Sequence, residues 1–384
     1  MHFFDSRQVE VGGTYYALKG NKDGHDFLEE VALRGGVEAV VDEQYQGHSY
    51  GLHLVRVKSV LDELHRRAAE VQKPPIIGVT GSVGKTTTKE FIAEILKERF
   101  KVEKTPENYN SQISFPITVL NLKMADVWVL EMGMSYPGEI NKLVQIAPPL
   151  IGVVTRIGLA HAMNFKDIDA IAEAKSEIFS SPLTQWKVVT EQAASFQAIR
   201  ERGNAKLHLV PQGKGGPFSA AHINEDFSIA REVALLMGLA EEDIERAIPR
   251  LLTPKHRFHV FEKGGVTFVD DSYNSNPTSL LAALKNLPKA ERKTIAVIGE
   301  MRELGPFSAD SHDFIAEEAS SLVDQVLLYG KETERMKKIF DQKQIPVEWF
   351  ADKVCLKERL DVVAQKGDVV LVKGSKSNQL WEVC

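Results

Sequence analysis

The chain has 384 residues, 43% of them hydrophobic and 26% charged, a length and composition that predict a globular protein of two or three domains. Its formal net charge of -6 argues against a nucleic-acid binder, which needs a basic surface. Its two cysteines, Cys355 and Cys384, have no metal-ligand spacing, and because we see neither a signal peptide nor a membrane-length apolar run, we expect a cytoplasmic protein.

Residues 1–73 predict a small α/β domain. Short apolar runs at 15–18, 37–41 and 52–57 alternate with helical patterns at 27–33 and 60–71. Pro74 and Pro75 follow, and because proline disfavours helix at the preceding residue, we expect a linker here.

A glycine-rich loop opens the second part of the chain, residues 74–253. The segment GSVGKT at 81–86 lies between an apolar strand at 76–79 and a helix predicted over 86–100. Such a loop lets backbone N–H groups approach phosphate oxygens, while Lys85 adds a positive charge and Thr86 a hydroxyl for Mg²⁺. The general pattern has a further glycine where this chain has Val79, so an ordinary strand–helix turn is the alternative.

Two polar side chains follow predicted strands of the same part. Glu131 ends the strand at 127–130, and His161 comes after the strand at 151–155. Ligands of open α/β sheets bind at the carboxyl ends of parallel strands, so Glu131 is expected to ligate Mg²⁺ and His161 to bind metal or phosphate. A solvated acid and a structural histidine are the alternatives. A further strand is predicted at 187–189 and a loop at 211–217.

Lys175 lies on the apolar face of a helix predicted over 167–179. Ile168, Ile171 and Ile178 share one stripe, and Lys175 occupies the i+7 position of that stripe. Burying an ammonium group is costly unless it is paired or neutralised. The alternative is a lysine whose stem packs while its head reaches water.

Residues 254–384 alternate strands and helices in a regular series. The strands are predicted at 266–269, 294–298, 325–329, 347–350 and 369–372. This alternation predicts a mainly parallel sheet covered by helices on both faces, and the fold class of the whole chain is therefore α/β.

Motifs along nearly the whole chain point to one family. They are DSR at 5–7, TGSVGKTTTK at 80–89, NYN at 108–110, EMG at 131–133, AKSEIF at 174–179, Arg257, DDSYNSNP at 270–277, GEMRELG at 299–305 and KGS at 373–375. DDSYNSNP and AKSEIF are highly specific when they occur together. By these motifs the chain resembles the Mur ligase family.

The resemblance implies an ATP-dependent amide (peptide) ligase with three domains. The first, 1–73, would be a UDP-substrate domain reduced at its N-terminus, the second, 74–253, a central ATP-binding domain, and the third, 254–384, a Rossmann-like domain for the amino substrate. ATP would convert a carboxylate into an acyl phosphate, which a free amine attacks. The implied partners are a UDP-linked muramoyl peptide and a D-alanyl-D-alanine dipeptide of peptidoglycan synthesis. We expect a monomer that binds no nucleic acid and has no membrane span.

The resemblance also implies roles for individual residues. Nucleotide phosphates would be held by Gly81, Ser82, Gly84, Lys85, Thr86 and Thr87. Asn274 would meet the adenine, Arg257 the phosphates, and Asp271 the ribose or phosphate region. Ser6 and Arg7 would contact the uridine diphosphate.

The implied metal ligands are Thr86, Glu131, His161 and Lys175. The family carbamylates the lysine that matches Lys175 with CO₂, which would turn a buried cation into an anion able to ligate Mg²⁺. Lys85, Lys175 and His161 are the implied catalytic residues.

Departures from the family pattern leave alternatives for the function. They fall at Ser111, Ser114, Arg156 and Met163. One alternative is a related ligase that joins another carboxylate and amine. Another is a non-catalytic ATP-binding regulator, although Lys85, Glu131 and Lys175 are all retained. A simple NTPase or kinase would leave the third domain and Lys175 without a purpose.

Overall fold

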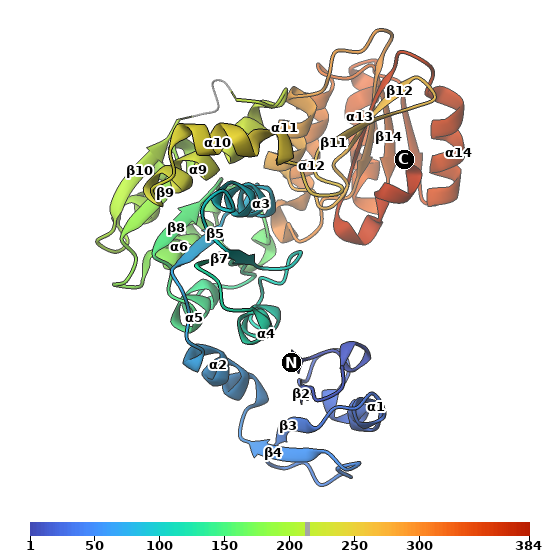
Figure 1. The fold of residues 1–384 in the computed structure, drawn as a ribbon. Helices are drawn as coiled ribbons and strands as arrows, with labels where there is room; N and C mark the ends of the chain where they lie inside the picture. Colours follow the sequence, from blue (N-terminus) through green and yellow to red (C-terminus); the bar gives the residue numbers. More distant parts are fainter. Residues whose placement is uncertain (212–215) are drawn as a thin grey trace.

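A computed structural model describes residues 1–211 and 216–384, so most of the predicted loop at 211–217 lies outside the described residues. Within these residues the strands form three sheets. Figure 1 shows the N-terminal sheet (blue) at one end of the molecule, the central sheet (blue through green to yellow-green) next to it, and the C-terminal sheet (yellow-orange to red) at the other end. No helix in the described part of the chain is both long and apolar enough to cross a membrane.

The N-terminal sheet has the strand order β1-β2-β3-β4, and its strands pair in parallel. Its strands are β1 (His2–Phe3), β2 (Thr14–Tyr16), β3 (Glu38–Asp42) and β4 (His53–Val57), and its helices are α1 (Leu28–Leu33) and α2 (Val60–Glu70). Ser59 caps α2 by accepting a hydrogen bond from the backbone N–H of Asp62 at 3.2 Å. α2 packs against the helices α4 and α5 of the central part and so joins the two.

The central sheet has the order β10-β9-β8-β5-β7-β6 and is parallel in each of its pairs. Its strands are β5 (Ile76–Thr80), β6 (Val102–Lys104), β7 (Val127–Glu131), β8 (Ile151–Val154), β9 (Trp186–Thr190) and β10 (Lys206–Val210). The associated helices are α3 (Lys85–Leu96), α4 (Ser114–Asn121), α5 (Glu139–Ile146), α6 (Ile168–Ser176), α7 (Glu191–Ala194), α8 (Gln197–Glu201), α9 (Ala221–Leu236) and α10 (Glu241–Ala247). Strands β5, β7 and β8 are buried along their whole length, which explains their continuous apolar runs.

The C-terminal sheet has the order β11-β12-β16-β13-β14-β15. Its strands are β11 (His259–Lys263), β12 (Val266–Asp270), β13 (Thr294–Gly299), β14 (Gln325–Tyr329), β15 (Val347–Phe350) and β16 (Val369–Lys373), and its helices are α11 (Pro277–Lys285), α12 (Ser308–Ala319), α13 (Glu334–Gln342) and α14 (Lys353–Val363). The predicted α/β class and the predicted parallel series are confirmed. The exposed edge strand β11, which pairs antiparallel to β12, was not predicted.

Two helix boundaries differ from the sequence prediction. The helix predicted over 86–100 is α3, which begins at Lys85 and ends at Leu96. The helix predicted over 167–179 is α6 followed by a 3₁₀ turn at Glu177–Phe179. Asp167 caps α6 by accepting from the N–H of Ala170 at 2.8 Å, so it lies outside the helix rather than in it.

Candidate active site between the central and C-terminal sheets

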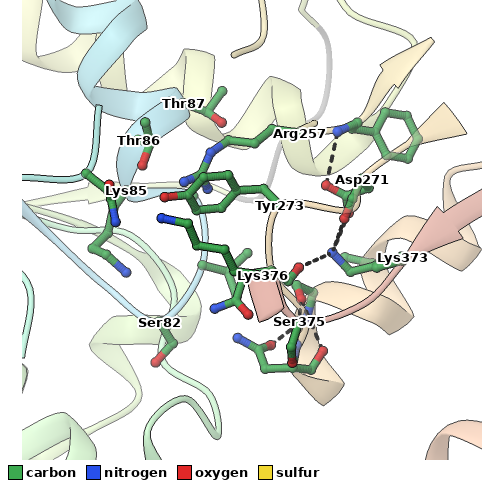
Figure 2. Close-up of a pocket in the computed structure, with 18 of the residues that line it drawn as sticks. Ser82, Lys85, Thr86, Thr87, Arg257, Asp271, Tyr273, Lys373, Ser375 and Lys376 are labelled. Carbon is green, nitrogen blue, oxygen red and sulfur yellow. Dashed lines mark hydrogen bonds and ion pairs between the residues drawn. The ribbon is translucent and has the colours of Figure 1, made fainter. Parts of the chain in front are cut away.

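A cavity of about 740 Å³ lies between the central and C-terminal parts. The central part contributes the phosphate loop, Glu131, His161 and the start of α9, while the C-terminal part contributes the loops that follow β12, β13 and β16. Predicted site residues that line it are Ser82, Gly84, Lys85, Thr86, Thr87, Glu131, His161, Arg257, Asp271 and Asn274. Figure 2 shows Lys85, Thr86 and Thr87 facing Arg257, Tyr273 and Lys376 across this space.

The phosphate loop is a tight backbone turn that only glycine fits at two positions. Gly81 has φ +150° and Gly84 has φ +87°. A Cβ built on Gly81 would overlap the Thr155 hydroxyl, and one on Gly84 would overlap the Asp226 carboxyl. The loop is closed by Lys85, whose Nζ donates to the Gly81 carbonyl at 2.8 Å. Burial, together with the nearby Arg257 and against the pull of Glu131, lowers the pKa of Lys85.

Glu131 presents its carboxylate beside the start of α3. Thr86 Oγ1 donates to its Oε2 at 2.8 Å, and Asn110 Nδ2 donates to its Oε1 at 2.6 Å. The fully buried Lys89 lies 4.0 Å from Oε2 and donates to the carbonyls of Thr105 at 2.7 Å and Glu107 at 2.8 Å. The Thr86 hydroxyl, the Glu131 carboxylate and the Asn110 amide thus lie side by side. Oxygen atoms of these groups suit Mg²⁺, whose remaining ligands are usually water molecules.

His161 reaches across to the C-terminal part of the molecule. It has φ +55°, and its Nδ1 lies 2.7 Å from Glu303 Oε2. The backbone N–H of Met163 donates to the Glu303 carbonyl at 3.0 Å, so the two segments are joined twice. His161 thus lines the same cavity as Glu131 but pairs with a carboxylate of the other sheet. The described residues contain no group of three or more His, Cys, Asp and Glu side chains arranged to hold a metal ion.

Lys175 is buried on α6 and only 1% exposed. The interpretation that its head reaches water is therefore wrong. Burial and the neighbouring Lys85 lower the pKa of Lys175 well below its usual value, and Glu131 opposes this shift. Lys175 does not line the cavity but lies close enough to Lys85 and Glu131 to interact with both charges.

The segment at 270–277 brings aromatic and charged groups to the other wall. The Arg257 guanidinium lies 4.0 Å from the centre of the Tyr273 ring, and Lys376 Nζ lies 5.4 Å from it. Lys373 is buried and pairs with Asp271 Oδ2 at 2.6 Å while it donates to the Asn274 carbonyl at 3.0 Å. Asp271 also accepts from the N–H of Phe258 at 3.0 Å, so its carboxylate has two partners within the protein.

Ser6 and Arg7 lie outside this cavity, in the turn that follows β1. Ser6 is buried and donates to Glu30 Oε2 at 2.7 Å. The Arg7 guanidinium is 77% exposed and pairs with Asp5 at 2.7 Å. Both residues therefore follow the carboxyl end of a parallel strand, but of a different sheet.

Several lining residues were not among those predicted. Asp226 on α9 accepts from Thr88 Oγ1 at 3.0 Å, and burial raises the pKa of its carboxyl well above the usual value. Asp226 follows Ile223 by one helical turn and precedes Ile229 and Ala230 by one turn, so it lies on the buried apolar stripe of α9. A charged residue on an apolar stripe is the pattern that also pointed to Lys175. Tyr273, Arg302 and Lys376 lie within or next to motifs that were recognised, but no local pattern marks their side chains as facing the cavity.

Comparisons with known proteins agree with this arrangement. The family model of the Mur ligase middle domain matches residues 79–231, and that of the Mur ligase, glutamate ligase domain matches residues 256–376. The chain is 31% identical to UDP-N-acetylmuramoyl-tripeptide--D-alanyl-D-alanine ligase of Bacillus subtilis, over 99% of this chain and 91% of the relative, and 30% identical to the Treponema pallidum protein of the same name, over 97% and 90%.

Solved structures resemble the whole chain as well. MurF from Acinetobacter baumannii superposes with a TM-score of 0.86 at 25% identity, covering 100% of this chain and 92% of that one. MurF ligase from Thermotoga maritima in complex with ADP superposes with a TM-score of 0.83 at 27% identity, covering 100% and 95%. By sequence and by fold, the chain belongs to the Mur ligase family.

Proposed function

We propose that the protein is the ATP-dependent peptide ligase that joins D-alanyl-D-alanine to a UDP-N-acetylmuramoyl tripeptide in peptidoglycan synthesis, with release of ADP and phosphate. The observation that carries the proposal is the cavity in which the phosphate loop faces the 270–277 segment and the loops after β13 and β16. The activity for which the full-length relatives are named supports it.

Each sheet has its own part in this proposal. Residues 1–73 bind the UDP-linked substrate, residues 74–253 bind ATP, and residues 254–384 receive the amino substrate. The position of Ser6 and Arg7 after a parallel strand supports the first assignment. The ranges of the two family models, 79–231 and 256–376, fall within the second and third.

The phosphate loop fits a nucleotide triphosphate. Gly81 and Gly84 take the positive φ values that the turn requires, and the start of α3 adds a favourable dipole. Lys85 neutralises phosphate charge from the central side, and Arg257 does so from the opposite wall. ATP supplies the phosphoryl group that activates the substrate carboxylate. Asn274 would contact the base, and Thr86, Glu131 and His161 would hold Mg²⁺, which would neutralise phosphate charge.

Lys175 is proposed to carry a carbamate. Burial lowers the pKa of Lys175 and so favours the neutral amine. Its nitrogen attacks CO₂, an N–C bond forms as one C=O π bond opens onto a carboxylate oxygen, and the nitrogen loses one proton to solvent. The product is an anion near Lys85 and Glu131, which the Lys85 cation would offset and which would supply an oxygen ligand for Mg²⁺.

The carbamate is tested with the Lys175→Ala variant and by control of CO₂. The variant should lose ligation, a short-chain acid at high concentration should partly restore it, and degassing should reversibly depress the wild-type rate. A ¹³C NMR carbamate signal from enzyme equilibrated with ¹³CO₂ should vanish in the variant. Full ligation by Lys175→Ala would rule the carbamate out.

The ligase reaction is tested by phosphate release with sets of carboxylate and amine substrates. We expect release only when ATP, the UDP-muramoyl tripeptide and D-alanyl-D-alanine are all present. Release with a different pair would identify a related ligase, release with ATP alone an NTPase, and ATP binding without release a regulator; each of these would overturn the proposal.

A further inference from the structure

The C-terminal sheet has a topological switch point on the cavity side. β16 and β13 are parallel neighbours in this sheet. The chain after β13 continues into α12, which packs with α11 and α13, whereas the chain after β16 packs on α14. The loop after β13 and the loop after β16 therefore run to opposite faces of the C-terminal sheet. In open α/β sheets, ligands bind in the crevice between two neighbouring strands whose loops separate in this way.

Arg302, in the loop after β13, lines the cavity at this crevice. Its backbone N–H donates to Ser375 Oγ at 2.8 Å, which ties the two loops together. Its guanidinium is held by one oxygen of the buried Glu300, at 3.0 Å from Nε and 2.9 Å from Nη2. These contacts use two of the five N–H donors of a guanidinium, and the side chain is 54% exposed, so the group is oriented and still able to bind a ligand.

The other cations that line this wall already have partners or face elsewhere. Lys373 is buried against Asp271. Arg257 and Lys376 lie against the Tyr273 ring, and Figure 2 shows them on the side of the cavity that faces Lys85 and Thr86. Arg302 instead lines the cavity where the loops after β13 and β16 meet, and its backbone contacts Ser375.

We propose that Arg302 binds the free carboxylate of the dipeptide, and so sets the specificity for an amine that carries a C-terminal carboxyl group. The proposal rests on the proposed function, because the dipeptide named there has one ammonium group to react and one carboxylate to be recognised. A guanidinium fork matches a carboxylate with two parallel hydrogen bonds, which fixes the orientation of the substrate as well as its charge.

The test compares D-alanyl-D-alanine with its C-terminal amide, which keeps the amine and loses the charge. Initial rates are measured at saturating ATP and UDP-muramoyl tripeptide. The wild-type enzyme should show a KM for the amide roughly 10- to 100-fold above that for the acid, the range expected for a hydrogen bond to a charged group. Arg302→Ala should raise the KM for the acid by a similar factor and leave the KM for the amide nearly unchanged.

Two further variants sharpen the comparison. Arg302→Lys keeps the charge but not the fork and should restore part of the preference for the acid. Arg335→Ala removes an arginine that pairs with Asp313 outside the cavity and should retain the wild-type preference.

The outcomes separate this inference from the function on which it rests. If the wild-type enzyme ligates neither amine, the proposed function fails. If it ligates the acid but Arg302→Ala affects acid and amide equally, or if Lys376→Ala abolishes the preference instead, the ligase stands and the role of Arg302 is overturned.

Discussion

Three helices of the central part each carry a charged side chain among their buried residues. Lys89 on α3, Lys175 on α6 and Asp226 on α9 are 0%, 1% and 6% exposed. Burying a charge is costly, so such a residue has a partner or a neutralised form. Lys89 has carbonyl partners and pairs with Glu90 at 3.2 Å. Burial moves the pKa of Lys89, of Lys175 and of Asp226 toward the neutral form. In these three helices, a charged side chain on the buried face therefore indicates that the cavity lies nearby.

Lys85→Ala should lower ATP turnover by roughly 100- to 1,000-fold, because a preorganised charge at the phosphates is lost. Phosphate release with all substrates present measures the rate, and circular dichroism checks the fold. Lys97→Ala, an exposed lysine at the end of the same helix, is the matched control and should retain the wild-type rate. Near wild-type turnover in Lys85→Ala would contradict the assignment of the loop.

His222 should make the protein less stable as the pH falls. Burial, opposed by Asp271 and reinforced by Lys373 and Arg156, lowers the pKa of His222 from 6.5 to about 4. The unfolded chain takes up a proton below pH 6.5 while the folded chain does not, so stability is lost between these values, by at most about 1.4 kcal/mol per pH unit.

Urea unfolding of wild type and His222→Phe between pH 7 and pH 4.5 measures this loss. The free energy of unfolding of the wild type, relative to the variant, should decrease toward the lower pH. The matched control is His259→Phe, which replaces an exposed histidine on β11. A pH-independent difference for His222→Phe would show that the ring titrates alike in both states.

At the scale of elements, the ends of strands and the starts of helices build the site. Glu131 ends β7, Lys85 begins α3, and Asn276 caps α11 by accepting from the N–H of Ser279 at 2.9 Å. The proline that follows Asn276 suits the first turn of a helix, so the DDSYNSNP segment is held at a fixed exit from β12. Arg302 and Lys376 likewise lie in turns that leave strands.

Gly84 and Gly138 form a matched pair for testing the phosphate loop. Both precede a helix with nearly equal φ, +87° and +85°, but a Cβ meets Asp226 at Gly84 and nothing within 4 Å at Gly138. Gly138→Ala should cost roughly 1–2 kcal/mol of stability from backbone strain alone. Gly84→Ala should cost more and should also weaken ATP binding, as measured by urea unfolding and by calorimetric titration with ATP. Equal costs and unchanged ATP affinity would contradict the close approach of α9 to the loop.

At the scale of the whole molecule, the cavity exists only because two sheets present their carboxyl ends to the same space. His161 and Met163 of the central part meet Glu303 of the C-terminal part, and Ser82 to Thr87 face the 270–277 segment. The N-terminal sheet is joined to the central part through α2 and contributes no residue to this cavity. Substitutions in the N-terminal sheet and substitutions in the cavity should therefore have separate effects.

Arg7→Ala should raise the KM for the UDP-linked substrate by roughly 10-fold, as expected when a hydrogen bond to a charged group is lost, and should leave the KM for ATP unchanged. Steady-state rates with each substrate varied in turn measure both constants. Arg66→Ala on α2 removes an exposed arginine from the same part of the chain and should change neither constant. An equal change in both constants for Arg7→Ala would count against a UDP site in the first 73 residues.

Local patterns were enough to predict the buried strands β5, β7 and β8, the helices α2, α3 and α6, and the five strands β12 to β16 of the C-terminal sheet, but the strands β1, β6 and β10 were missed. Burial leaves a readable pattern in the sequence. Strands β5, β7 and β8 are buried at every position and therefore form continuous apolar runs, whereas α6 is buried on one face and has apolar residues at helical spacing. β11 was missed because its strand is exposed, although Gly264 and Gly265, with φ +62° and +77°, form a hairpin turn that could have indicated it. The end of α3 at Leu96 was also missed, since helix ends depend on weak local preferences.

Residues close together in the chain were enough to predict the glycine-rich loop, the strand-end Glu131 and the buried position of Lys175, and short motifs spread along the chain were enough to predict the family. Contacts between distant segments could not be predicted in this way: Asp226 lies behind Gly84, His161 pairs with Glu303, and Arg302 contacts the loop after β16. These pairs join distant segments, and their meeting depends on the order of strands in each sheet and on how two sheets face one another. The spacing of apolar residues along a helix or strand shows which of its faces is buried, but it does not show which distant helix or strand packs on that face.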